Sequence, residues 1–157
     1  YKVDQKKYFM SAIVASIKSS IKDAMRAKDK PRLSTLRLAS AEFKRVEEDE
    51  RIDIDDDRAL VILDKMVKQR QNSIEQYEQA DRHDLADTEK FEISVISEFL
   101  PEALSEDELA KIVADAVTQT GAASMQDMGK LMGVLKPQVQ GRADMAQVSR
   151  LVKAALG

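Results

Sequence analysis

The apolar residues of this chain recur at steps of three and four, and no strand-like alternation of useful length appears. One such series consists of Leu60, Leu63, Val67, Ile74 and Tyr77, and the charged residue Arg70 stands at a position of the same series. Its heptad-like spacing predicts one long helix with a seam that suits an antiparallel hairpin partner. Arg70 falls on this seam, so we expect its guanidinium either to reach the edge or to pair with a carboxylate. The pattern as a whole predicts an all-α fold.

Helix start and stop signals place two helices before this seam. We expect Ser11 to cap a first helix that ends near Lys28, and Pro31 to occupy the first turn of a second helix, where its missing N–H is not needed. The predicted core-facing residues are Ile13, Ile17, Ile21, Ala24 and Met25 in the first helix and Leu33, Leu36, Phe43 and Val46 in the second. An acidic stretch follows, and residues 55–57 offer an N-cap to the long third helix.

A proline marks the boundary between two predicted domains. We expect a fourth helix from about Asp84 to Leu100, because Pro101 forces the residue before it out of the helical region. Its candidate core residues are Leu85, Ile93, Ile96, Phe99 and Leu100. We therefore predict an N-terminal four-helix domain with a long antiparallel hairpin over residues 10–100. Residues 1–9 lack an amphipathic pattern, and we interpret them as a leader outside the fold.

Three shorter helices are predicted to form a small C-terminal bundle over residues 101–157. Ser105 opens a capping box, and Gly121 is the expected left-handed stop of the helix that follows. The segment Ser124–Asp127 repeats the cap signal, and we expect Pro137 to close the next helix from beyond its end. A last helix is predicted to begin near Asp144. A bundle of this size is marginal and is expected to need a neighbour or a partner.

The residue types that catalysis and metal binding require are scarce in this chain. There is no cysteine, and His83 is the only histidine, so thiolate sites, histidine-based zinc sites and a Ser-His-Asp triad have no partners available. We interpret His83 as an ordinary loop or helix-start residue. The alternating residues Asp53, Asp55 and Asp57 lack the glycine and the terminal glutamate of a calcium loop. We therefore expect no metal, no cofactor and no catalytic activity of the chain alone.

The glycines and the longer apolar stretches exclude other classes of function. No glycine-rich phosphate loop is present, which argues against an ATP-dependent enzyme. Gly129 and Gly133 lie four residues apart, and we expect them to let two helices touch. No apolar run approaches the length of a membrane span, and no signal peptide is recognisable. We expect a cytoplasmic protein without a membrane partner.

Basic residues are distributed unevenly, although the net charge is only −3. From Gly121 to the end there are five basic residues against two acidic ones, whereas residues 47–57 hold eight acidic residues against one basic residue. The five are Lys130, Lys136, Arg142, Arg150 and Lys153. Clustered cations neutralise phosphates, and the lack of aromatic residues after Phe99 favours recognition of a folded RNA by its shape over base stacking. The alternative is a solvated helix face.

Several segments resemble the YqeY family, which is related to the tail of the B subunit of tRNA-dependent amidotransferases. The similar pieces are RLSTLR at 32–37, KQR at 68–70 with SIE at 73–75, FLP at 99–101 followed by LS at 104–105, DMGK at 127–130 and GRAD at 141–144. Their order and spacing cover essentially all of residues 10–157. The resemblance implies an all-helical fold with a larger N-terminal and a smaller three-helix C-terminal domain. In the amidotransferase, glutaminase and kinase-like chemistry lie in other domains, which the resemblance does not include.

The resemblance implies a non-catalytic module that binds tRNA or another structured RNA. The candidate phosphate contacts are Lys130, Lys136, Arg142 and Arg150, together with Lys153, Arg32 and Arg37. Arg142 has a structural alternative, since it can pair locally with Asp144 in the turn that begins at Gly141, and Arg32 and Arg37 can equally belong to a paired or solvated face. Two other functions remain open. One is a protein-protein adaptor that uses Met128, Met132 and the acidic loop; the other is an accessory role in a glutamine-dependent amidotransferase (carbon-nitrogen ligase) reaction.

Overall fold

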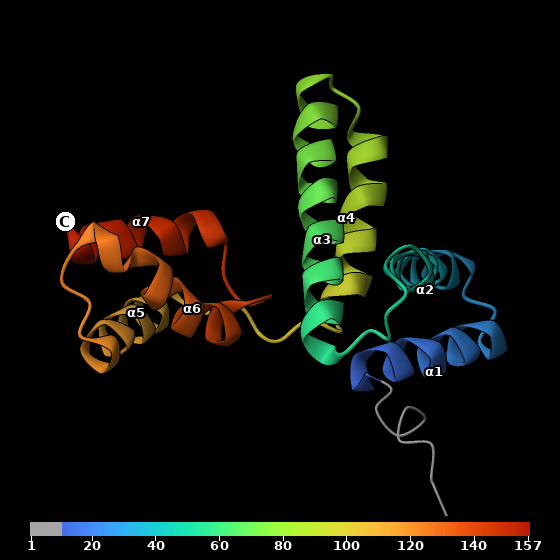
Figure 1. Ribbon diagram of the computed structural model, residues 1–157. Helices are drawn as coiled ribbons and strands as arrows, with labels where there is room; N and C mark the ends of the chain where they lie inside the picture. Colours follow the sequence, from blue (N-terminus) through green and yellow to red (C-terminus); the bar gives the residue numbers. More distant parts are fainter. Residues whose placement is uncertain (1–10) are drawn as a thin grey trace, which may run out of the picture. The chain divides into compact units, whose positions relative to one another are not determined.

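The computed structural model describes residues 11–157, which fold into seven α-helices and one short 3₁₀ helix without any strand. The all-α prediction is therefore confirmed. The chain divides into two compact units, of which the first ends at Leu100 and the second runs from Pro101 to Gly157. Figure 1 shows α1 to α4 in the first unit and α5 to α7 in the second. The leader predicted over residues 1–9 lies outside the described residues. No helix in the described part combines the length and the apolar character that crossing a bilayer requires.

The four helices of the first unit are α1 (Ala12–Arg26), α2 (Lys30–Glu50), α3 (Asp56–Gln79) and α4 (His83–Ser97). The starts of α1 and α3 follow the predicted caps. The Ser11 hydroxyl accepts a hydrogen bond from the Val14 amide at 3.2 Å, and the Asp55 carboxylate accepts one from the Arg58 amide at 2.8 Å. Pro31 lies in the first turn of α2, as expected. These three predictions rested on side chains within three residues of the helix start, where local chemistry decides.

Two helix ends come earlier than predicted. α1 ends at Arg26, and Lys28 takes a left-handed φ of 55°. α4 ends at Ser97, because its last turn tightens: the amides of residues 98, 99 and 100 bond to the carbonyls three residues before them. This 3₁₀-type closure satisfies the terminal carbonyls before Pro101 is reached. The fourth helix therefore stops three residues short of Leu100.

One apolar core unites the four helices of the first unit. Its most deeply buried large side chains are Ile17, Leu36, Leu63 and Ile96, one from each helix. The prediction that Met25 belongs to this core is wrong, because its side chain is 53% exposed while its neighbour Ala24 is buried. Adjacent positions on a helix point about 100° apart, so a narrow interface admits only one of them. The small Ala24 takes that place.

The helices α3 and α4 run antiparallel side by side as a hairpin (Figure 1). The buried residues that α3 gives to the core lie between Ala59 and Val67. Beyond them the two helices are held by an ion pair, in which Arg70 Nε lies 2.9 Å from Glu92 Oε2 with side chains only 14% and 19% exposed. Of the two arrangements expected for Arg70, the carboxylate pair is the one that forms.

The second unit contains α5 (Glu106–Thr120), the 3₁₀ helix η2 (Met125–Asp127), α6 (Met128–Val139) and α7 (Met145–Leu156). The Ser105 hydroxyl accepts a hydrogen bond from the Glu108 amide at 3.1 Å, and Gly121 ends α5 with φ of 68°, as predicted. The three helices have a core of their own. Its buried residues are Leu109, Val113, Ala116, Leu131, Leu135, Val139, Val148, Val152 and Leu156.

Two predictions about α6 are wrong. Pro137 lies inside the helix rather than beyond its end. Gly129 and Gly133 do not let two helices touch, since both are exposed and a Cβ added to either would meet no atom within 4 Å. The buried side of α6 is formed instead by Leu131 and Leu135, so the glycines and the proline occupy the solvent side.

Candidate nucleic-acid interface

Ion pairs among the described residues all lie in the first unit, between residues 23 and 98. No lysine or arginine of the second unit comes within ion-pair distance of a carboxylate of residues 11–157. The two units therefore differ in whether their lysines and arginines form ion pairs. The lysines and arginines of residues 101–157 are unpaired, whereas about half of those described in the first unit are paired with carboxylates.

Two predicted phosphate contacts, Arg32 and Arg37, belong to α2 of the first unit. The Arg32 guanidinium forms an ion pair with Glu98, just after the end of α4. Arg37 is exposed and forms no ion pair with a described residue. These two arginines lie in a different unit from the other five candidates, and one of them is engaged within the fold.

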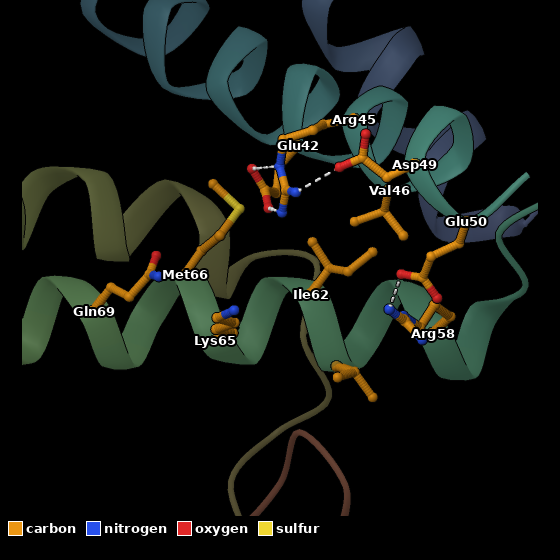
Figure 2. A pocket seen from close by; sticks show the side chains of 11 residues that line it. Glu42, Arg45, Val46, Asp49, Glu50, Arg58, Ile62, Lys65, Met66 and Gln69 are labelled. Atoms are coloured by element: carbon orange, nitrogen blue, oxygen red, sulfur yellow. Dashed lines mark hydrogen bonds and ion pairs between the residues drawn. The ribbon is translucent and has the colours of Figure 1, made fainter.

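A groove of about 290 Å³ lies between α2 and α3 of the first unit (Figure 2). On its rim, Arg45 donates hydrogen bonds to Glu42 and, at 3.0 Å, to Asp49, while Arg58 pairs with Glu50. The hydrogen bond from Arg45 lowers the pKa of Glu42 below its usual value. The apolar lining of the groove consists of Val46, Val61, Ile62 and Met66. Because carboxylates accompany the arginines here, the groove offers no net positive surface to a phosphate.

On the second unit, α6 exposes Lys130 and Lys136 to solvent. They stand three residues before and three residues after Gly133, on the side of the helix opposite Leu131 and Leu135. Both ammonium groups lack an ion pair with any described residue. This arrangement fits the prediction that these lysines are free to contact phosphates.

The exposed side of α6 contains residues that weaken a helix. A glycine inside a helix costs about 1 kcal/mol relative to alanine, and a proline about 3 kcal/mol. Gly129, Gly133 and Pro137 are all exposed, and the packing of the unit requires none of them. This surface was not predicted from the sequence. The available signal was the position of glycine and proline on the polar side of an amphipathic helix.

The last helix, α7, exposes Arg150 and Lys153. Residues three apart are neighbours on a helix surface, so these two cations share one side. The opposite side of α7 is buried through Val148 and Val152. The helix thus presents a pair of positive charges away from the core.

Arg142 lies in the turn between α6 and α7 and holds the start of the second unit. Its Nε donates a hydrogen bond to the Glu102 carbonyl at 3.2 Å, and its own carbonyl accepts one from the Leu104 amide at 2.8 Å. The alternative of a local pair with Asp144 is not the arrangement observed: no ion pair joins the two side chains, and the Asp144 carboxylate caps α7 by accepting a hydrogen bond from the Ala146 amide at 2.9 Å. Arg142 therefore has a structural role, and its side chain is only partly exposed.

Both acidic residues after Gly121 serve as backbone acceptors. Asp144 caps α7, and the Asp127 carboxylate accepts hydrogen bonds from the amides of Ala123 at 2.9 Å and Ser124 at 3.3 Å. These bonds, with a smaller contribution from Lys130, lower the pKa of Asp127. Both carboxylates are held by backbone amides, and neither lies within ion-pair distance of a lysine or arginine of α6 or α7.

His83 is the first residue of α4, where its exposed Nε2 lies 2.9 Å from Asp81 Oδ1. This is the ordinary helix-start position that was predicted. Over residues 11–157, no three His, Cys, Asp or Glu side chains gather into a group that could hold a metal ion.

Comparison with known proteins gives one family and several relatives. A family model described as Yqey-like protein matches residues 14–156. Altered inheritance of mitochondria protein 41, mitochondrial, of Pyrenophora tritici-repentis is 26% identical over 150 residues, which cover 94% of this chain and 82% of that protein. The protein of the same name from Lachancea thermotolerans is 33% identical over 68% of this chain and 58% of its own length. An uncharacterised protein of Schizosaccharomyces pombe is 33% identical over 58% of this chain and 74% of its own length.

The expectation of a cytoplasmic protein is contradicted by these relatives. The names of the proteins from P. tritici-repentis and L. thermotolerans describe both as mitochondrial. Our expectation had rested on the lack of a recognisable signal peptide or membrane span, and neither observation distinguishes the cytoplasm from the interior of an organelle.

Proposed function

Because this chain belongs to the Yqey-like protein family, we propose that it is a non-catalytic module that binds tRNA or another structured RNA. One observation carries the proposal: the second unit keeps its lysines and arginines clear of carboxylates, while the ion pairs of the described residues lie in the first unit. Unneutralised cations on rigid helices are the groups that attract a phosphate backbone.

The contacts are proposed to come from α6 and α7. Lys130 and Lys136 would bind phosphates from one helix, and Arg150 and Lys153 from the other. Such contacts release counterions and depend little on sequence, so the folded shape of the RNA would provide the selectivity. Since related proteins carry the word mitochondrial in their names, we further propose that the RNA is one present in mitochondria.

The adaptor alternative has less support from the geometry. Met128 and Met132, which were candidates for a partner surface, are partly buried against the core of the second unit. Their contacts are therefore largely used within the fold. We would favour a protein-protein adaptor only if the chain fails to bind RNA in the experiment below.

The test is a titration of tRNA with the purified chain at several salt concentrations. The parent protein is expected to bind at low salt, with an affinity that falls steeply as salt rises. The double variants K130A/K136A and R150A/K153A should each bind more weakly, with a salt slope reduced by about one, or somewhat less, per lost phosphate contact. Lys111→Ala is the control, because this lysine is also exposed and in the second unit but lies on α5.

Two results would count against the proposal. Undetectable binding of tRNA by the parent at low salt would remove the RNA function. Unchanged affinity and slope in both double variants would remove α6 and α7 as its site. All four side chains are outside the core, so circular dichroism should show unchanged helicity and a loss of binding cannot be ascribed to unfolding.

A further inference from the structure

A second groove of the first unit, of about 260 Å³, is lined by residues of α1 and α2. Its apolar lining consists of three buried side chains, Val14, Ile17 and Phe43. Charged side chains join this lining from both helices, with Lys18 on α1 and Lys44 on α2. An apolar depression with charged groups around it has the anatomy of a protein-protein contact, in which an apolar anchor of the partner fills the centre.

The lysines of this groove are not neutralised within the fold. Lys18 and Lys44 are exposed, and neither forms an ion pair with a described residue. Among the described residues that line the groove, the only carboxylate is that of Glu47. The groove between α2 and α3 differs, because its arginines are paired with carboxylates. An occupant that complements the α1–α2 groove therefore needs an apolar side chain with a carboxylate close to it.

The helix α4 presents this combination on its outer side. Phe91 is 41% exposed, and Asp87, one turn earlier, is exposed and forms no ion pair with a described residue. Residues four apart lie on the same side of a helix, so the ring and the carboxylate are neighbours. Phe91 does not line the groove of its own chain, and both stand on helices of one packed unit. The contact between them therefore has to join two chains.

We propose that Phe91 of one chain inserts into the α1–α2 groove of a second copy, while Asp87 pairs with the lysines at the edge of that groove. An amphipathic helix laid into an apolar groove is a recurrent mode of recognition. A phosphate backbone would also neutralise the lysines, but it has no apolar group to fill the space between the two helices. The contact uses residues of the first unit only, so it does not rest on the proposed RNA function.

Sedimentation equilibrium of the purified chain at rising protein concentration measures this contact. The parent should show an average mass above that of one chain, and this mass should increase with concentration. Phe91→Ala should lower the association constant about tenfold or more, as the loss of a central aromatic anchor does. The reversals D87K and K18E/K44E should each leave a monomer, because like charges then face one another across the contact.

A mixture of the D87K and K18E/K44E chains makes the test specific. In the mixture, the new lysine of one variant meets the new glutamates of the other, and the native Asp87 meets the native lysines, so association should return. Lys65→Glu and Glu75→Lys are the controls, because they reverse exposed, unpaired charges on α3, and each should associate like the parent. All these charged side chains are exposed, so circular dichroism should show unchanged helicity.

Three results would overturn the proposal. The first is a parent that sediments as a monomer at every concentration; if its K18E/K44E variant also binds tRNA more weakly than Lys65→Glu does, the two lysines contact phosphates instead. The second is association that persists at the parent's strength in K18E/K44E or in Phe91→Ala. The third is a mixture of the two reversed variants that stays monomeric. A parent that associates as expected but fails to bind tRNA would remove the RNA function alone.

Discussion

At the scale of single residues, Asp56 connects two helices that are distant in sequence. Its carboxylate accepts hydrogen bonds from the Ser11 hydroxyl and, at 3.2 Å, from the Ile13 amide, although Asp56 itself belongs to the first turn of α3. The start of α1 is thus capped both by its own Ser11 and by a residue 43 positions from Ile13. The bond from Ser11, followed by those from the backbone, lowers the pKa of Asp56.

Replacement of Asp56 by alanine is expected to lower the free energy of unfolding by about 1 kcal/mol at pH 7, the usual effect of losing a helix cap. A carboxyl whose pKa is lower in the folded state stabilises the protein above its unfolded pKa of about 3.9, and loses this effect as the pH falls through the folded value. The difference between parent and variant should therefore shrink below pH 4. Urea denaturation at several pH values measures it. Asp57→Ala, in the same turn, is the control. An equal loss of unfolding free energy in that variant would show that the helix dipole, and not the cap on α1, causes the effect.

At the scale of elements, the α3–α4 hairpin depends on the pair between Arg70 and Glu92. Removal of one member of a largely buried pair leaves an uncompensated charge, which costs roughly 3 to 5 kcal/mol when burial is complete. These side chains keep some exposure, so Arg70→Ala should lower the free energy of unfolding by about 2 kcal/mol. The double variant R70M/E92M should lose less than Arg70→Ala, because it leaves no lone charge. A double variant that is less stable than Arg70→Ala would contradict this account.

The same hairpin contains a carboxyl group whose ionisation destabilises the folded protein. Burial first, and then the nearby Glu92, raise the pKa of Glu89, while Arg70 opposes them. The folded state therefore binds the proton more tightly than the unfolded state, and the ionised form carries a penalty above the folded pKa that disappears as the pH falls below the unfolded value. Glu89→Gln should stabilise the protein at pH 7, and this gain should vanish by pH 4.

Thermal unfolding of Glu89→Gln at both pH values gives the comparison. Glu78→Gln is a control of opposite sign on the same hairpin, because the hydrogen bond from Lys90 lowers the pKa of Glu78. That variant should be less stable than the parent at pH 7. If the two glutamine variants shifted the melting temperature in the same direction, the electrostatic explanation would be wrong.

The elements also show which parts of the fold local sequence could predict. The starts of α1, α3 and α5 were predicted because each cap lies within three residues of the amide that it binds. The end of α4 was displaced by three residues, since a tightened last turn competes with the signal of Pro101. The exposed position of Pro137 inside α6 was not predicted, because a proline near the end of an apolar pattern usually indicates that the helix has ended.

At the scale of the whole molecule, the cations of the candidate interface could be found from sequence, but their availability could not. Arg32 pairs with Glu98, 66 positions away, and Arg142 bonds to the carbonyl of Glu102, 40 positions away. Charge counts along the chain contain no information about such distant partners. The contrast between a first unit rich in ion pairs and a second unit without them is a property of the folded chain.

The link between the two units gives the last prediction. Leu100 packs against the core of the first unit and Leu104 against that of the second, so only Pro101, Glu102 and Ala103 are left exposed between them. A protease specific for glutamate should therefore cut first after Glu102, with the bond after Glu50, at the end of α2, as the competing site. Mass spectrometry of the early fragments should show a break between residues 102 and 103.

Arg142 makes this prediction sensitive to a single side chain. Its Nε holds the Glu102 carbonyl, at the bond that the protease must reach. A protease binds its substrate in an extended, locally opened form, so cleavage follows the population in which this contact is broken. Arg142→Ala should raise the cleavage rate several-fold, as the loss of one hydrogen bond of about 1 kcal/mol implies. Lys111→Ala should leave the rate unchanged, because Lys111 lies on α5 without a contact to the link. A resistant fragment that spans both units in the parent would show that residues 101–103 are protected, and an unchanged rate in Arg142→Ala would show that this side chain does not hold them.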